Sequence, residues 1–167
     1  KQENLARKPE PRSAPIDAPR RNDSVSVSHS ANDASDLSVI STQSTIMMVD
    51  DEPLILETLQ MFLEDAGYHN FITTTEPKRA LNMVVLKKPD VVLLDVMMPE
   101  ISGLDILKQM RSKEALKHIP TIILTSATDP ATKLQALELG ATDFLAKPVD
   151  PSELALRLRN TLAAKAY

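Results

Sequence analysis

From Thr45 onward, short runs of apolar or β-branched residues alternate with longer stretches in which apolar residues recur every three or four positions. Runs of the first kind are typical of strands, and stretches of the second kind are typical of amphipathic helices. We expect five strands, at 46–49, 71–74, 91–94, 121–124 and 143–145, and five helices, at about 53–66, 77–87, 104–111, 130–139 and 151–166. Four of these helices begin at or near a proline, which suits a first turn because no backbone N–H is needed there.

This alternation of strands and helices predicts an α/β fold built on a parallel sheet. Parallel neighbours require a crossover connection, and right-handed crossovers place helices on both faces of an open sheet. The runs at 91–94 and 121–124 are almost wholly apolar, which fits central strands that are covered on both sides. In sheets of this kind, functional residues gather at the carboxyl ends of the strands.

Residues 1–44 have a different composition from the rest of the chain. This segment holds four prolines, then eight serines between Ser24 and Ser44, and few large apolar side chains. Such a sequence buries too little surface to offset the entropy of ordering the chain. We therefore predict a disordered Pro/Ser-rich linker or tail at 1–44, with a connection to a preceding domain as the alternative, and a single folded domain at 45–167.

Composition narrows the classes of function. The 167 residues, 43% of them hydrophobic, suffice for one core, and the net charge of −4 argues against a chain that neutralises nucleic-acid phosphates. The absence of cysteine excludes disulfides and thiolate chemistry and fits the reducing cytoplasm, which is the expected location. No apolar run is long enough for a membrane span.

Polar and charged residues stand at the carboxyl ends of four predicted strands. Asp50 and Asp51 follow the first strand, Asp95 the third, Thr125 the fourth and Lys147 the fifth. Each has an ordinary explanation when taken alone: acidic residues before a helix stabilise its first turn, and a lysine is usually solvated. Those separate explanations do not account for the arrival of all of them at one edge, which favours a shared site.

The chemistry of this group points to magnesium and phosphoryl transfer. Clustered carboxylates repel one another, and a hard divalent cation with oxygen ligands relieves that repulsion. Mg²⁺ fits better than Zn²⁺ because the group offers oxygen atoms and neither cysteine nor a nearby histidine. Beside such an ion, Asp95 can attack a phosphoryl group, while Lys147 balances the developing charge and Thr125 donates a hydrogen bond.

Four stretches carry a resemblance to a known family. They are TIMMVDDEP at 45–53, PDVVLLDVMMPEISGLDIL at 89–107, IPTIILTSA at 119–127 and GATDFLAKPVDPSEL at 140–154. The chain from Thr45 to Tyr167 resembles the receiver domain of two-component response regulators, and the four stretches together are highly specific. The resemblance implies a flavodoxin-like five-stranded parallel sheet in the order 2-1-3-4-5, and it implies a phosphorelay switch.

The resemblance also assigns roles to the residues at the sheet edge. It implies that Asp95 is the phosphoacceptor and that a sensor histidine kinase or phosphotransfer protein is the donor. Asp51 would bind Mg²⁺ directly, Asp50 largely through water, and the backbone carbonyl of Met97 would complete the protein's share of ligands. Lys147 would pair with the phosphoryl group, and its peptide bond to Pro148 would be cis.

Output is expected to depend on a switch between Thr125 and Phe144. In the family, the hydroxyl at the first position is coupled to an aromatic residue at the second, where many members carry tyrosine. An ordinary core aromatic remains the alternative for Phe144. The last helix predicts an effector domain beyond Tyr167, and the alternative is a stand-alone receiver that acts through protein contacts, including a phosphorylation-dependent homodimer.

Two rival functions involve the same residues. A Mg²⁺-dependent phosphohydrolase would need a second aspartate two residues after Asp95, where Met97 stands, so no substrate turnover is expected. A degenerate receiver would have lost part of the set at the sheet edge, which is complete here. Met97 and Met98 are expected to pack as a hydrophobic latch, and Gly103 is expected to serve a turn.

Overall fold

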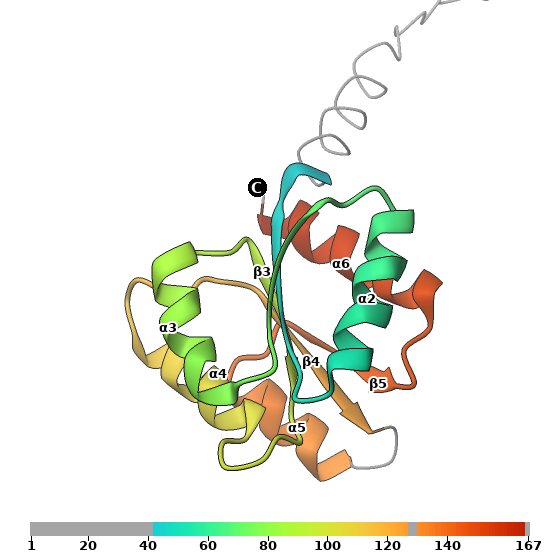
Figure 1. Ribbon diagram of the computed structural model, residues 1–167. Coiled ribbons are helices and arrows are strands. Elements are labelled where there is room, and N and C mark those ends of the chain that lie inside the picture. The colour runs from blue at the N-terminus through green and yellow to red at the C-terminus, as the bar shows by residue number, and fades with distance from the viewer. Residues whose placement is uncertain (1–41, 127–129, 166–167) are drawn as a thin grey trace, which may run out of the picture.

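The structure is a computed structural model that describes residues 42–126 and 130–165 (Figure 1). Almost all of the predicted linker or tail at 1–44 lies outside the described residues, and so does the expected last residue of the final helix, Ala166. The strands are β1 (Thr45–Val49), β2 (Asn70–Thr74), β3 (Val91–Asp95), β4 (Thr121–Ser126) and β5 (Asp143–Lys147). The helices are α2 (Pro53–Asp65), α3 (Pro77–Lys87), α4 (Gly103–Ser112), α5 (Pro130–Glu138) and α6 (Pro151–Lys165). None of these helices is both long and apolar enough to cross a membrane.

All five strands pair in parallel in the order β2-β1-β3-β4-β5, which confirms the predicted flavodoxin-like α/β fold. In the register of the sheet, Val49 lies opposite Leu94, Asp95 opposite Leu124, and Ser126 opposite Lys147. This register brings the carboxyl ends of the four strands that carry candidate residues to one edge.

Helices cover both faces of the sheet, as Figure 1 shows. Successive strand residues point to opposite faces, so each strand contributes to two apolar layers. One layer packs α2 and α6 against the sheet, and the buried leucines that these two helices contribute to it are Leu56, Leu59, Leu63, Leu154, Leu158 and Leu162. The other layer packs α3, α4 and α5, among others through Ala80, Val84, Leu107, Met110 and Ala136. Because each fully buried leucine contributes about 1.5–3 kcal/mol, the two layers together fix the sheet in place.

Local sequence signals account for the helix ends. The helices α2, α3, α5 and α6 begin with proline, whereas α4 begins with a capping box in which Ser102 and Asp105 satisfy each other's backbone N–H groups. Gly67 and Gly140 follow α2 and α5 with φ angles of 101° and 95°, conformations that favour glycine. The predicted helix ends at these glycines are confirmed to within one or two residues.

Three strands run further than their apolar residues predict. β3 continues through Asp95, β4 through Ser126 and β5 through Lys147. Backbone pairing defines a strand, and it continues after the side chains have changed from apolar to polar. Asp95, Thr125 and Lys147 therefore stand at the ends of paired strands, where the hydrogen bonds of the sheet hold their backbones.

Candidate functional site

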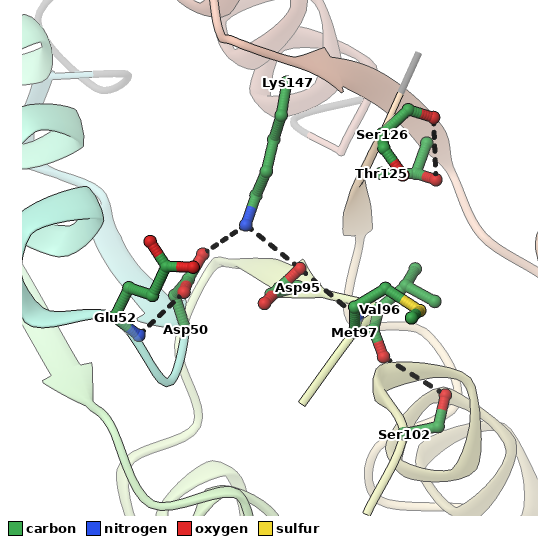
Figure 2. Close-up of polar contacts among 9 residues, drawn as sticks. All are labelled: Asp50, Glu52, Asp95, Val96, Met97, Ser102, Thr125, Ser126 and Lys147. Carbon is green, nitrogen blue, oxygen red and sulfur yellow. Dashed lines mark hydrogen bonds and ion pairs between the residues drawn. The ribbon is translucent and has the colours of Figure 1, made fainter. Parts of the chain in front are cut away.

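The carboxyl edge of the sheet gathers the residues that the sequence predicts (Figure 2). Asp50 follows β1 and is fully buried, and Asp95 ends β3 with only 3% of its surface exposed. Asp51, next to Asp50, is partly buried, as is Lys147 at the end of β5. Thr125 lies near the end of β4 and is buried. Four segments distant in sequence thus place three carboxylates, a hydroxyl and an ammonium group at the same end of the fold.

Lys147 joins two of the carboxylates. Its Nζ lies 2.7 Å from Oδ2 of Asp50 and 3.1 Å from Oδ1 of Asp95. The other oxygen of Asp50, Oδ1, accepts a hydrogen bond of 2.9 Å from the backbone N–H of Glu52. Both oxygens of Asp50 therefore have protein donors, which fixes its side chain at the start of α2. Glu52 is the N-cap of α2 and makes no side-chain cap bond.

The two oxygens of Asp95 have different surroundings. Oδ1 accepts hydrogen bonds from Lys147 and, at 3.3 Å, from the backbone N–H of Met97. Among the described residues, no donor contacts Oδ2, and none of their buried side-chain polar atoms lacks a partner. It follows that Oδ2 retains contact with solvent. Asp95 thus presents one anchored oxygen and one that an incoming group can reach.

Burial changes the acidity of Asp95. Desolvation is the main cause that raises its pKa from 3.8 to about 6, and the negative charge of Asp50 adds to the rise. The hydrogen bond and the positive charge of Lys147, together with the N–H of Met97, act in the opposite direction. Burial also lowers the pKa of Lys147, but its hydrogen bonds to Asp50 and Asp95 and their charges outweigh that effect, so its pKa is raised. The ammonium is therefore firmly protonated, whereas Asp95 holds its negative charge at a cost.

The carboxylates are close enough together to share a cation. Asp50, Asp51 and Asp95 each place one oxygen within 4.8 Å of the others. With Lys147 included, this group carries a formal surplus of negative charge, and it offers oxygen ligands only. A hard cation such as Mg²⁺ suits that donor set and that charge. The three residues fit the expected magnesium site, and the role of the Met97 carbonyl in it stays a prediction.

Thr125 stands at the same edge but its hydroxyl is engaged elsewhere. Its Oγ1 donates to the backbone carbonyl of Ser126 at 3.3 Å (Figure 2). Asp95 pairs with Leu124 across β3 and β4, so Thr125 is one residue beyond the Asp95 carboxylate in the register. The hydroxyl hydrogen rotates about the Cβ–Oγ1 bond, so this hydroxyl can donate to another acceptor that comes within its reach.

A comparison with known families completes these observations. The model of the response regulator receiver domain matches residues 46–159, which is more than half of the chain and includes every candidate site residue. The chain belongs to the receiver domain family. Receiver domains of response regulators are components of two-component signalling, and this chain therefore carries a signalling domain.

Curated relatives agree with this assignment. The receiver domain is 39% identical over 118 residues to the phosphate regulon transcriptional regulatory protein PhoB of Pseudomonas aeruginosa, covering 71% of this chain and 51% of that protein. It is 42% identical over 118 residues to the response regulator SaeR of Staphylococcus epidermidis, covering 71% of this chain and 50% of the relative. The chain therefore spans about half the length of the curated relatives it matches.

Solved structures show the same fold. The chemotaxis response regulator CheY4 of Vibrio cholerae is 32% identical, with a TM-score of 0.66 over 72% of this chain and 99% of that one. The receiver domain of the Francisella response regulator 1452 is 27% identical, with a TM-score of 0.67 over 75% of this chain and all of that one (100%). Receiver domains from different organisms thus share this arrangement of helices and strands.

Phe144 of the receiver domain lies on β5. Its ring is partly buried and packs against the layer formed by α3, α4 and α5. The ammonium of Lys133, on α5, lies 5.0 Å from the ring centroid, a cation–π contact. Sequence reasoning did not single out Lys133, because a lysine on a helix gives no sign of which ring it covers. The switch role of Phe144 stays a prediction.

The prediction that Met97 and Met98 form a hydrophobic latch is wrong for Met97. Its side chain is 75% exposed beside Asp95, whereas Met98 packs partly buried against α3, α4 and α5. The backbone N–H of Met97 donates to Asp95 while its side chain points into solvent. Of these two consecutive residues, Met97 therefore faces solvent and Met98 faces the apolar core.

The prediction that Gly103 serves a turn is also wrong. Gly103 is the first residue of α4, and a Cβ atom there would lie 2.0 Å from the backbone oxygen of Asp95. The capping pattern Ser102-x-x-Asp105 could have identified the helix start from sequence, since this spacing is typical of a capping box. The contact with Asp95 had no such signal.

Proposed function

We propose that this receiver domain is a phosphorylation switch in which Asp95 accepts a phosphoryl group from a phosphohistidine on a sensor histidine kinase or a phosphotransfer protein. The observation that supports this most strongly is the contact of Lys147 with Asp50 at 2.7 Å and with Asp95 at 3.1 Å. An ammonium group that contacts two buried carboxylates is also close enough to pair with the negative oxygens of a phosphoryl group attached to one of them.

The transfer itself requires one bond to form and one to break. An oxygen of Asp95 attacks phosphorus, the P–N bond to the donor imidazole breaks, and the imidazole nitrogen keeps the electron pair and then takes up a proton from water. Oδ2 is the candidate nucleophile because no described donor contacts it. Lys147 then moves its contact from Asp95 to the phosphoryl oxygens, and Thr125 turns its hydroxyl from Ser126 toward them.

Mg²⁺ is the cofactor of this proposal. Asp51 and Asp95 would hold it directly together with the carbonyl of Met97, and Asp50 largely through water. The ion supplies positive charge that offsets the charge of the phosphoryl oxygens during transfer. Asp95 itself must be ionised to attack, and a pKa of about 6 leaves it mostly ionised at neutral pH.

The response is carried away from the site by Thr125 and Phe144. Phosphorylation biases the position of both side chains and alters the face near α5 and β5, which then contacts an effector. The effector is a domain beyond Tyr167, and the alternative is a separate protein or a second copy of the receiver. PhoB, a relative about twice as long as the matched region, is named as a transcriptional regulatory protein. The receiver itself is not the part that contacts nucleic acid in this proposal, and its expected location is the cytoplasm.

Replacement of the acceptor carboxylate tests the proposal. Incubation with acetyl phosphate and Mg²⁺ should add one phosphoryl group to the parent protein, measured by intact mass, and none to Asp95→Ala. Asp65→Ala is the matched control, because Asp65 is exposed at the end of α2 and should leave the modification unchanged. Modification of Asp95→Ala at the parent's rate, or a beryllofluoride-induced spectral change of equal size, would refute the assignment.

A Mg²⁺-dependent phosphohydrolase is the enzymatic alternative to this proposal. That class needs an acidic residue two positions after the nucleophile, and Met97, a thioether with no proton to give, stands there. We therefore expect no multiple turnover of small phosphate esters. Sustained release of phosphate from p-nitrophenyl phosphate in the presence of Mg²⁺, abolished in Asp95→Ala, would favour the enzyme over the switch.

A further inference from the structure

Gly103 lies closer to the backbone of Asp95 than any other residue type would permit. A Cβ atom at this position would lie 2.0 Å from the carbonyl oxygen of Asp95, 2.8 Å from its carbonyl carbon and 3.1 Å from Cα of Val96. All three neighbours are backbone atoms, at the last residue of β3 and the residue after it, so no flexible side chain can move aside. Of the three glycines, Gly67 and Gly140 have positive φ angles and Gly103 does not. The requirement at Gly103 is therefore for space alone.

Hydrogen bonds fix the start of α4 to the residue that follows Asp95. The N–H of Gly103 donates to the carbonyl of Val96 at 3.0 Å, and the hydroxyl of Ser102 donates to the same carbonyl at 3.3 Å (Figure 2 shows the second bond). On its other side, the N–H of Val96 donates to the carbonyl of Leu124 at 3.1 Å. The peptide groups on either side of Val96 are thus held between β4 and the first turn of α4.

The peptide group between Val96 and Met97, whose carbonyl accepts the bonds from α4, also makes the connection to the carboxylate. The N–H of Met97 donates to Oδ1 of Asp95 at 3.3 Å, so the orientation of that peptide determines where the anchored oxygen of Asp95 lies. The loop from Asp95 to Gly103 folds back on itself, and its closing contact is the one that a Cβ atom would prevent. Any displacement of α4 from Asp95 would shift the Met97 peptide and the carboxylate together.

We propose that Gly103 and Ser102 are positioning residues for phosphoryl acceptance: the close approach of Gly103 and the hydroxyl of Ser102 seat the first turn of α4 on Asp95–Val96 and so align the Asp95 carboxylate and the Met97 peptide. This inference rests on the proposed function of the site. It adds a requirement beyond the carboxylates and Lys147, because neither positioning residue is among those proposed to hold the phosphoryl group or the metal.

Intrinsic helix preference makes the opposite prediction, which sharpens the test. Alanine is preferred to glycine within a helix, so Gly103→Ala would stabilise α4 if nothing lay against it. With the contact to Asp95, the added methyl group must instead displace either the helix start or the strand end. A loss of function at Gly103→Ala is therefore opposite to the effect that the secondary structure alone predicts.

The experiment compares three single variants of the full chain with the parent. Gly103→Ala should raise the Mg²⁺ dissociation constant, measured by titration of backbone amide NMR shifts, and lower the rate of modification by acetyl phosphate at saturating Mg²⁺. We expect about tenfold or more in each, the size seen when groups that orient a metal ligand are removed. Ser102→Ala should show a smaller loss in both measurements, about threefold, because the hydrogen bond of Gly103 to Val96 survives.

Asp105→Ala is the matched control. Asp105 is exposed and contributes only to the capping box of α4, so its removal weakens the helix start without a contact to Asp95. It should leave Mg²⁺ affinity and the rate of modification within twofold of the parent. A Gly103→Ala protein that matches the parent in both measurements overturns the inference and leaves the proposed function intact. If Gly103→Ala does not fold, Ser102→Ala decides, and equality of Ser102→Ala with Asp105→Ala overturns the inference. A parent that neither binds Mg²⁺ nor is modified overturns both.

Discussion

The two edges of the sheet each join an aspartate to a lysine, with opposite electrostatic results. At the amino edge, Lys165 of α6 lies 3.2 Å from Asp90, and the side chains are 33% and 43% exposed. At the carboxyl edge, Lys147 is 24% exposed and its partner Asp50 is fully buried, with a second carboxylate, Asp95, at 3.1 Å. At the amino edge, one carboxylate and one ammonium group neutralise each other near water. At the carboxyl edge, the buried carboxylates carry more negative charge than Lys147 neutralises.

The two edges differ in whether their carboxylate oxygens are still free to contact a ligand. Asp90 also accepts the N–H of Thr45 at 2.7 Å, so its oxygens at the amino edge are both engaged within the protein. At the carboxyl edge, burial raises the pKa of Asp95 to about 6, and Oδ2 has no described donor. An exposed, neutral ion pair mainly holds chain segments together. A buried group with excess negative charge is stabilised further when a cation binds.

Loss of Lys147 should have the largest effect. Lys147→Ala leaves Asp50 buried without its ammonium partner, and the free energy of unfolding without metal should fall by about 3 kcal/mol at pH 7. Modification by acetyl phosphate should fall at least about a hundredfold, because the charge that developed on the phosphoryl group loses its partner. Urea unfolding followed by circular dichroism and intact-mass kinetics would measure the two effects. A variant as stable as the parent would contradict the comparison.

Neutralisation of Asp95 should have the next largest effect and the opposite sign. The pKa of folded Asp95, about 6, lies above the usual 3.8, so its stabilising contribution is complete below pH 4 and is lost as pH rises through 6. Asp95→Asn avoids that loss. In EDTA, it should exceed the parent in unfolding free energy by roughly 2 to 3 kcal/mol at pH 7 and by almost nothing at pH 4. A stability difference that does not change between these pH values would rule out the explanation by burial.

The amino edge should respond least. Lys165→Ala removes an exposed ion pair, and the free energy of unfolding should fall by about 0.5 kcal/mol or less, with the difference reduced further in 1 M salt. Phosphoryl acceptance should not change, since Lys165 is at the far end of the strands. Thermal unfolding at two salt concentrations and the acetyl phosphate assay would measure both properties. A large loss of acceptance here would show that the two edges are coupled.

The sequence predicts most of the fold because two signals mark many of its elements. One is the spacing of their apolar residues, and the other is the residue type at their ends. The run at 91–94 indicated a buried strand, and Gly67 and Gly140 marked where α2 and α5 end. The last residues of β3, β4 and β5 were not predicted as strand. Asp95, Ser126 and Lys147 are polar, and only the backbone pairing, which leaves no trace in residue type, extends those strands.

The parts of the candidate site that depend on side-chain chemistry can be predicted from the sequence. The parts that depend on contacts between backbone atoms cannot. Asp50, Asp95 and Lys147 are residue types with few other reasons to share an edge, and they lie together in the structure. The seat of α4 on Asp95 was missed, because a glycine signals the absence of a side chain and not the identity of its neighbour. The exposure of Met97 was also missed, because an apolar residue type predicts packing and Met97 contacts Asp95 only through its backbone N–H.

The network of Asp90 with Thr45 and Lys165 brings the first residue of β1 and the last turn of α6 to the same rim of the molecule. A strand of five residues spans roughly 16 Å. A partner module joined at either of these points would therefore be attached about that far from the carboxylates along the sheet. Helix α6 begins four residues after Lys147 and ends at this rim, so in the proposed switch it would be the direct structural connection between such a module and the site.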